Sequence, residues 1–105
     1  MPTYAEVWIE LLATEKGGRS LPIYLSTERG YYRPHFRVRG GDGKYLGVQF
    51  VDGPDGPLQP GSNAFATVEF MYHPQVNYDA LCVGAEFDIM EGGKKIVGTG
   101  RVTKI

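Results

Sequence analysis

Apolar and polar residues alternate with a period of two over most of this chain. In the stretch 4–12 four apolar residues share one face, while two glutamates and Trp8 share the other. This alternation is typical of a half-buried strand. Similar stretches follow at 31–39, 45–51, 64–72, 85–90 and 96–105. The pattern predicts about six strands, and no helical period extends beyond one turn.

Glycine and proline separate these stretches. Gly92-Gly93 predicts a tight turn because glycine reaches positive φ without a Cβ clash, and 40–43 predicts a second hairpin turn. Pro22 predicts that the short piece 21–25 lies at a sheet edge, since proline donates no ladder hydrogen bond. Stretch 64–72, apolar on both faces, reads as a central strand. These features favour an antiparallel barrel or sandwich, and the β-branched final strand favours a closed barrel.

Composition limits the classes of protein that fit. The 105 residues suit one domain, 1–105, and the net charge of −1 argues against a broad basic surface for wrapping nucleic acid. A single cysteine excludes an internal disulfide and fits a reducing compartment. No signal-peptide pattern occurs, and no apolar run approaches the ~20 residues that a membrane helix needs. We expect a cytoplasmic protein with no membrane partner.

One face of stretch 31–39 is strongly basic. It carries Arg33, His35, Arg37 and Arg39, with Pro34 indicating a bulge or bend. This face could bind an anion, or it could be an ordinary solvated surface. The nearby aromatic residues Tyr31, Tyr32, Tyr45 and Trp8 could complete a patch for RNA stacking or a protein hot spot, or they could fill the core. Trp8 could cover a loop, which is the more usual role of such a side chain, or it could be an exposed contact for a partner.

Catalytic and metal sites have little support. Cys82, His73 and Asp79 lie close in sequence, but they match no metal-ligand spacing, and a lone cysteine is usually a small buried hydrophobe. The segment 41–47 reads as a hairpin turn rather than a phosphate loop, and the chain contains no Gly-x-x-x-x-Gly-Lys-Ser/Thr motif. We therefore expect no GTP binding, no metal, no cofactor and no enzymatic activity.

Four segments, in order, resemble the third, C-terminal β-barrel domain of elongation factor Tu and its eukaryotic and archaeal counterparts. These are Leu11-Leu12 through Glu15-Lys-Gly-Gly-Arg19, Gly30-Tyr-Tyr-Arg-Pro-His-Phe-Arg37, Gln59-Pro-Gly-Ser-Asn63, and Glu91-Gly-Gly through Gly98-Thr-Gly-Arg-Val-Thr-Lys-Ile105. The resemblance spans nearly the whole chain. It implies a six-stranded antiparallel β-barrel, here as a stand-alone domain without the GTPase domain that precedes it in the family.

The resemblance also implies contact sites. In the family this barrel touches the T-arm of aminoacyl-tRNA, the exchange factor and its own GTPase domain. Arg19 and Glu91-Gly92 are kept, whereas His35 and His73 replace a Gln and a Lys, and Glu86 and Met90 replace two arginines. Lys94-Lys95 replaces a single Arg in the last turn. Lost cations weaken phosphate binding, so the barrel is expected to have drifted away from tRNA.

Two functions remain open at this point. The first is a non-catalytic module for protein–protein interaction, linked to the translation machinery. The second is a small RNA-binding domain, for which tRNA contact would be weakened. The candidate residues for RNA or partner binding are Arg19, Arg33, His35, Arg37, His73, Glu91, Gly92, Lys94 and Lys95. An exposed edge at 21–25 would also allow a homodimer by strand pairing.

Overall fold

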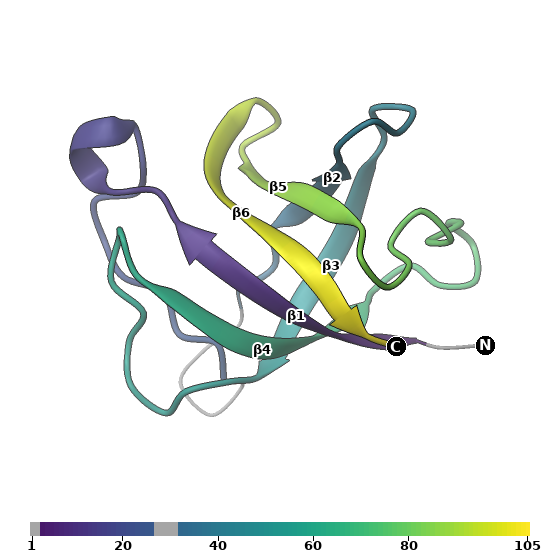
Figure 1. The fold of residues 1–105 in the computed structure, drawn as a ribbon, viewed down its shortest axis with the longest axis horizontal. Coiled ribbons are helices and arrows are strands. Elements are labelled where there is room, and N and C mark those ends of the chain that lie inside the picture. The colour runs from purple at the N-terminus through teal and green to yellow at the C-terminus, as the bar shows by residue number, and fades with distance from the viewer. Residues whose placement is uncertain (1–2, 27–31) are drawn as a thin grey trace.

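Six antiparallel strands close into a barrel in the computed structural model, which describes residues 3–26 and 32–105 (Figure 1). The strands are β1 (Tyr4–Leu11), β2 (His35–Val38), β3 (Tyr45–Asp52), β4 (Asn63–Phe70), β5 (Glu86–Glu91) and β6 (Lys95–Lys104), and one 3-10 turn, η1, spans Thr14–Lys16. The predicted all-β class and the six-stranded antiparallel β-barrel are confirmed.

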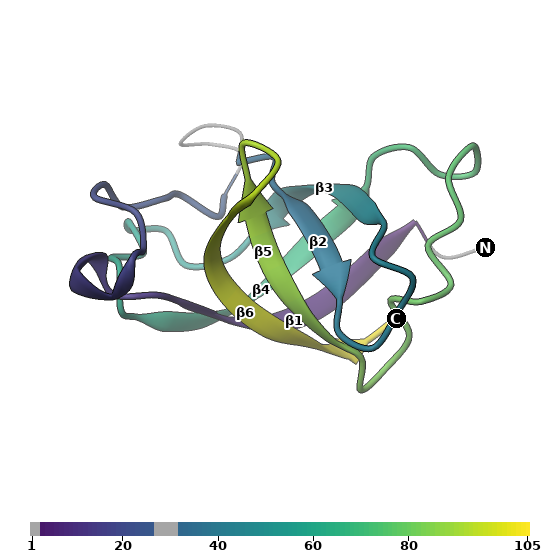
Figure 2. The same cartoon turned by 90° about the horizontal axis from the view of Figure 1, so that it is seen from above.

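The order of strands around the barrel is β1-β4-β3-β2-β5-β6, and β6 returns to β1. β1 therefore pairs on both sides. Its Trp8 lies opposite Phe65 of β4 and also opposite Arg101 of β6. β2 pairs with β3 and β5, which places it on the other side of the barrel from β1 (Figure 2).

The seam between β1 and β6 depends on glycine. A Cβ on Gly100 would lie 2.5 Å from the Trp8 carbonyl oxygen and 2.7 Å from the Phe87 ring. A Cβ on Gly98 would lie 2.6 Å from the Glu10 carbonyl oxygen. Only glycine lets β6 approach this closely, which explains the Gly-Thr-Gly sequence in a strand that is otherwise β-branched.

Inward-facing side chains fill the barrel with aromatic rings at its centre. Phe36 and Phe87 are fully buried and stack with ring centroids 3.9 Å apart, and Phe50 meets Phe36 edge-on at 6.0 Å. The alternation predicted for 4–12 is observed, since its four apolar residues are buried. The barrel therefore has a packed interior, and binding sites must lie on its outside or at its ends.

Three predicted strand assignments need correction. The strand predicted at 31–39 is only His35–Val38, and Tyr31 lies outside the described residues. The carbonyls of Tyr32 and Pro34 still accept hydrogen bonds from β3, but Pro34 has no N–H to donate in return. The strand predicted at 64–72 ends at Phe70 and has only its inner face buried, because a barrel has a single interior.

The predicted edge strand at 21–25 is also wrong. This segment forms a single bridge, between Ile23 and Leu58, and both Ile23 and Leu25 are buried. Because the six strands close into a barrel, the sheet has no edge strand, and segment 21–25 cannot be one. Homodimerisation stays a prediction, but pairing through this segment loses its basis.

The long connection between β4 and β5, residues 71–85, lies beside the start of β1 and the end of β6 at one end of the barrel, with η1 at the opposite end (Figures 1 and 2). This connection covers the outer face of β3, where a Cβ on Gly47 would lie 2.5 Å from the Tyr72 ring. Within residues 3–26 and 32–105, none of the helical structure is long and apolar enough to span a membrane.

Candidate functional site

The basic face of β2 is largely neutralised by β5. Arg37 lies opposite Asp88 in the β2–β5 register, and its guanidinium is 3.2 Å from the Asp88 carboxylate. Arg39 reaches the same carboxylate at 3.0 Å and approaches Glu86 at 3.9 Å. The side chain of Asp88 is only 13% exposed, so these pairs are partly desolvated. Two of the predicted anion-binding cations are thus engaged by carboxylates.

Arg19 belongs to a separate cluster with Glu91 and Tyr32. Its guanidinium forms an ion pair with Glu91 and lies 5.4 Å from the centroid of the Tyr32 ring. The Tyr32 hydroxyl donates a hydrogen bond to the same carboxylate. Burial, followed by this hydrogen bond, raises the pKa of Tyr32 well above its ordinary value. The cluster joins the loop after η1 to the β5–β6 hairpin.

The β5–β6 turn carries the remaining predicted cations. Gly92 and Gly93 both have positive φ, at 60° and 87°, as the predicted turn requires. Lys94 and Lys95 are exposed, and neither forms an ion pair with any described residue. Arg33 is exposed two residues before β2 begins. His35, the first residue of β2, is half-buried, and its ring centroid lies 6.1 Å from that of Tyr45.

The predicted aromatic patch is not one surface. Tyr32 faces the core and stacks on Phe50 at 5.6 Å, while Tyr45 is exposed on β3 opposite Arg37. Trp8 lies on the other side of the barrel, and Tyr31 falls outside the described residues. The structure therefore divides these residues between the core and two separate faces.

A second group of aromatic side chains lies on the outer face of β1 and β4. Phe65 is 69% exposed and lies opposite the half-buried Trp8, and Tyr4 is half exposed on the same face of β1. We call Tyr4, Trp8 and Phe65 the aromatic face. A hollow of about 190 Å³ beside Phe65 is lined by Glu6 and Asp52, among others. The neighbourhood of Phe65 is therefore both apolar and acidic.

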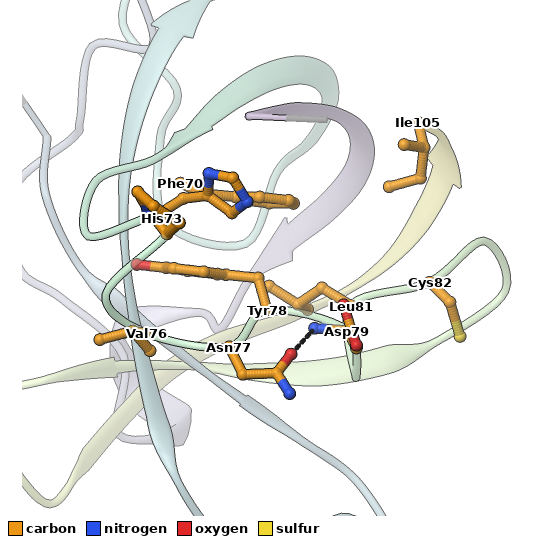
Figure 3. A pocket seen from close by; sticks show the side chains of 10 residues that line it. Phe70, His73, Val76, Asn77, Tyr78, Asp79, Leu81, Cys82 and Ile105 are labelled. Carbon is orange, nitrogen blue, oxygen red and sulfur yellow. Dashed lines mark hydrogen bonds between the residues drawn. The ribbon is translucent and has the colours of Figure 1, made fainter. Parts of the chain in front are cut away.

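A larger pocket of about 430 Å³ lies at the end of the barrel, within the 71–85 connection. We call it the end pocket. Its apolar lining comes mainly from Phe70, Val76, Tyr78, Leu81 and Ile105. The Phe70 and Tyr78 rings stack face to face, with centroids 4.6 Å apart and planes at 5°. Figure 3 views the Tyr78 ring from its edge, with Phe70 next to it.

Tyr78 fixes this connection to the barrel. Its buried hydroxyl donates to the Gly47 carbonyl oxygen at 2.6 Å and accepts from the Tyr72 N–H at 3.1 Å. Burial raises the pKa of the Tyr78 phenol. Because both hydrogen bonds use backbone groups of neighbouring segments, one wall of the end pocket is held rigidly.

His73 is the predicted site residue that lines the end pocket. Its Nε2 atom is buried and has no hydrogen-bond partner among the residues the structure describes. A buried polar atom is usually paired, so an unpaired ring nitrogen beside a pocket calls for an explanation. Arg19, Arg37 and the Lys94-Lys95 turn do not line this pocket.

Cys82 and Asp79 also line the end pocket, but they do not form a cluster with His73. The Cys82 side chain is exposed rather than buried as expected, since it lies on a turn of the connection. In Figure 3 its sulfur points away from His73, and Asp79 lies on the other side of the Tyr78 ring. Across residues 3–26 and 32–105, no group of three or more His, Cys, Asp or Glu side chains could hold a metal ion.

Sequence reasoning missed the residues that define these two surfaces. Phe65 belongs to stretch 64–72, which the alternation predicts to be apolar on both faces. Val76, Tyr78 and Leu81 lie between the predicted strands, where the alternation gives them no role. Three large apolar residues within one connection are a usable signal, because a loop that carries them usually covers part of the barrel. Known protein families add no assignment, because no family model matches this chain.

Proposed function

We propose that this chain is a non-catalytic binding module, built like the third domain of elongation factor Tu, that binds a basic segment of a partner protein on its aromatic face. The partner belongs to the translation machinery, or this barrel imitates the elongation factor's own third domain. The compartment in which this happens is the cytoplasm. Phe65 and Trp8 supply the apolar contacts, and Glu6 and Asp52 receive the partner's lysine or arginine.

The observation that carries this proposal is the exposure of Phe65 beside an acidic hollow. A side chain of this size that is 69% exposed, with Trp8 directly opposite it, is typical of an interaction site. The two carboxylates beside Phe65 favour a cation, which can lie over the ring while it meets a carboxylate. Phosphate groups would be repelled at the same place.

The cations elsewhere support a protein partner over RNA. Arg19, Arg37 and Arg39 are all held by carboxylates of β5, so they contribute little net positive field. Affinity for nucleic acid depends on cations that are free to displace counterions from phosphates. The loss of cations at Glu86 and Met90 points in the same direction.

The test is a quantitative pull-down from source-cell lysate with Phe65→Ser and, as a matched control, Leu21→Ser. Leu21 is 68% exposed but lies in the loop after η1, away from the aromatic face. Removing a hot-spot ring costs more than about 1 kcal/mol, so we expect recovery of the partner to fall at least fivefold for Phe65→Ser. Leu21→Ser is expected to recover the partner as well as the unmodified chain.

Charge reversal sharpens the same test. The double variant Glu6→Lys, Asp52→Lys should release the partner, whereas Asp55→Lys, at an exposed position outside the hollow, should not. Equal recovery by Phe65→Ser, Leu21→Ser and both charge variants would reject the proposed face. Failure to recover any reproducible partner would reject the function.

One observation favours an RNA-binding alternative. Lys94 and Lys95 are exposed on the β5–β6 turn and unpaired among the described residues, so they could meet phosphates. Fluorescence anisotropy with tRNA at low salt tests this idea. Binding that weakens steeply with salt and is lost in Lys94→Ser, Lys95→Ser would support it, and no binding at low salt would end it.

A further inference from the structure

The tip of the β5–β6 turn carries two cations that form no ion pair with any of residues 3–26 and 32–105. Lys94 and Lys95 are adjacent and exposed, and the exposed Ile96 follows them. The glycines before them, at 92 and 93, bear no side chain that could cover the lysines. The turn therefore presents two positive charges next to an apolar group.

The hollow beside Phe65 has the complementary character. Glu6 and Asp52 contribute carboxylates, and Phe65 contributes an exposed ring. Lys104 offsets the charge of Glu6 only weakly, because this 3.9 Å pair is largely exposed. The volume of the hollow, about 190 Å³, is roughly six times the share of one water molecule in the liquid, so the end of one lysine side chain fits there. Its ammonium would meet a carboxylate and a ring together.

The turn and the hollow lie apart on one barrel. In Figure 1 the turn between β5 and β6 stands at the top of the barrel, and β4, which carries Phe65, runs along its lower side. Arg101 is nearer, but it lies on the β6 side of Trp8, whereas Phe65 lies on the β4 side. A turn lysine that enters the hollow therefore has to come from another molecule.

We propose that the hollow beside Phe65 binds the Lys94-Lys95 turn of a second copy of this chain. The contact rests on the proposed function, because it uses the same acidic and aromatic surface. The two contacting surfaces differ, so the contact is heterologous, and each added copy leaves one turn and one hollow free. Copies therefore associate head to tail. A turn that enters a hollow buries little surface, so the association is weak and depends on salt.

The test is sedimentation equilibrium of the purified chain over roughly 10 μM to 1 mM protein, the range that suits a weak contact. At about 10 mM salt, where charges act over ~30 Å, the mean mass should rise above 11.6 kDa as the protein concentration increases. At about 1 M salt, where charges act over only ~3 Å, the mean mass should stay at 11.6 kDa.

Neutral variants of the two surfaces test the pairing itself. Lys94→Ser, Lys95→Ser removes the charges of the turn, and Glu6→Gln, Asp52→Asn removes those of the hollow. Each variant alone keeps only one of the two surfaces, so it should stay at 11.6 kDa. An equal mixture supplies one intact hollow and one intact turn. It should form a complex of twice 11.6 kDa and nothing larger.

Two matched controls make the same changes in charge elsewhere on the barrel. Lys16→Ser, Lys44→Ser removes two exposed cations, and Glu15→Gln, Asp55→Asn removes two exposed carboxylates. Both controls should associate as the unmodified chain does. An equal loss of association in the controls and in the variants of the two surfaces would show that net charge alone acts, and it would overturn the proposal.

NMR of the unmodified chain keeps the proposal open to rejection if a variant fails to fold. At low salt the amide shifts of Lys95 and Phe65 should change together with protein concentration, whereas that of the exposed Gly56 should not. A mean mass that does not rise with concentration, a mixture that stays monomeric, or concentration-dependent shifts that spare either surface would overturn the proposal.

Failure of this contact and failure of the proposed function give different results. Self-association is measured with the purified chain, whereas recovery of a partner is measured in lysate. A monomeric chain that still recovers a partner through Phe65 would overturn the head-to-tail contact alone. A chain that associates through the hollow but recovers no partner from lysate would overturn the proposed function alone.

Discussion

The two opposite faces of this barrel carry charge in different ways. On the β2–β5 face, arginines alternate along one strand and carboxylates alternate along its neighbour, so Arg37 and Arg39 both meet Asp88. On the β1–β4 face, Phe65 and Trp8 lie side by side, with Glu6 and Asp52 beside Phe65. The face that is richest in arginine is thus close to neutral, while the face with aromatic rings is acidic.

This difference shows that a count of cations along one strand does not predict the field around it. The cross-strand neighbour decides the field, because directly opposed side chains in a sheet lie within contact distance. The register of β2 against β5 turns a basic stripe into ion pairs. The register of β1 against β4 places two large rings together where no other element covers them.

The largest expected effect comes from opening the seam that holds the aromatic face in shape. In Gly100→Ala the new Cβ would meet the Trp8 carbonyl oxygen and the Phe87 ring, neither of which can move freely. We expect a loss of roughly 3 kcal/mol in the free energy of unfolding, measured by urea denaturation. Gly56→Ala, where the Cβ meets nothing within 4 Å, is the control. Equal stability of the two variants would show that the seam is looser than described.

A smaller effect is expected on the pH dependence of the free energy of unfolding, to which Tyr32 on the β2–β5 side contributes. Because the pKa of Tyr32 is raised in the folded chain, its stabilising contribution is complete below the ordinary tyrosine pKa of about 10 and declines as pH rises above it. The unfolded chain loses this proton first, so alkaline pH favours unfolding by up to about 1.4 kcal/mol per pH unit for this group.

Denaturation of the unmodified chain and of Tyr32→Phe at pH 9 and pH 11 measures this contribution. The variant should be less stable at pH 9 by about 1 kcal/mol, because Glu91 loses a hydrogen bond, yet it should lose less stability between the two pH values. Tyr78→Phe should also reduce the decline, since burial raises that pKa too. An equal loss in the free energy of unfolding between pH 9 and pH 11 in all three proteins would contradict the raised pKa values of the two buried phenols.

Asp88→Asn should convert the β2–β5 face into the basic surface that its sequence suggests. Removing this charge releases Arg37 and leaves Arg39 with only the distant, exposed Glu86 carboxylate at 3.9 Å, so affinity for tRNA should rise roughly threefold to tenfold, as expected for about 1 kcal/mol at a surface. The salt dependence should become steeper, as measured by anisotropy. Asp55→Asn makes the same change in net charge elsewhere. An equal rise in both variants would show that only total charge matters.

The smallest expected effect lies at the margin of the aromatic face. Lys104 approaches Glu6 at 3.9 Å, and both side chains are largely exposed. Such pairs contribute little, so Lys104→Ser should change the free energy of unfolding by less than about 0.5 kcal/mol. A larger loss in the free energy of unfolding, measured by urea denaturation, would mean that Glu6 stabilises the fold through Lys104. It would then be less able to bind a partner's cation.

The fold was predictable because the alternation and the glycine turns act locally. The turn at Gly92-Gly93 and the buried face of β1 follow directly from these patterns. The prediction of an edge strand at 21–25 is wrong because the local features of this segment resemble an edge strand, whereas closure of the barrel depends on strands elsewhere in the chain. Proline also shortened β2 more than the alternation suggested.

The site was less predictable because it depends on which strands are neighbours. Asp88 neutralises Arg37 only in the observed register, and Trp8 meets Phe65 only because β1 pairs with β4. Of the predicted binding residues, His73 alone lines the end pocket. Its unpaired nitrogen becomes visible only when the burial around it is known.

Photo-crosslinking tests the central claim most directly. Benzoylphenylalanine at position 65 replaces one exposed aromatic ring with another, and the same residue at position 21 is the matched control because the two positions are almost equally exposed. The account predicts that lysate irradiated with the position-65 protein yields a discrete crosslinked protein whose attached peptide contains lysine or arginine, and that position 21 yields none. Identical crosslinks from both positions, or none from position 65, would contradict it.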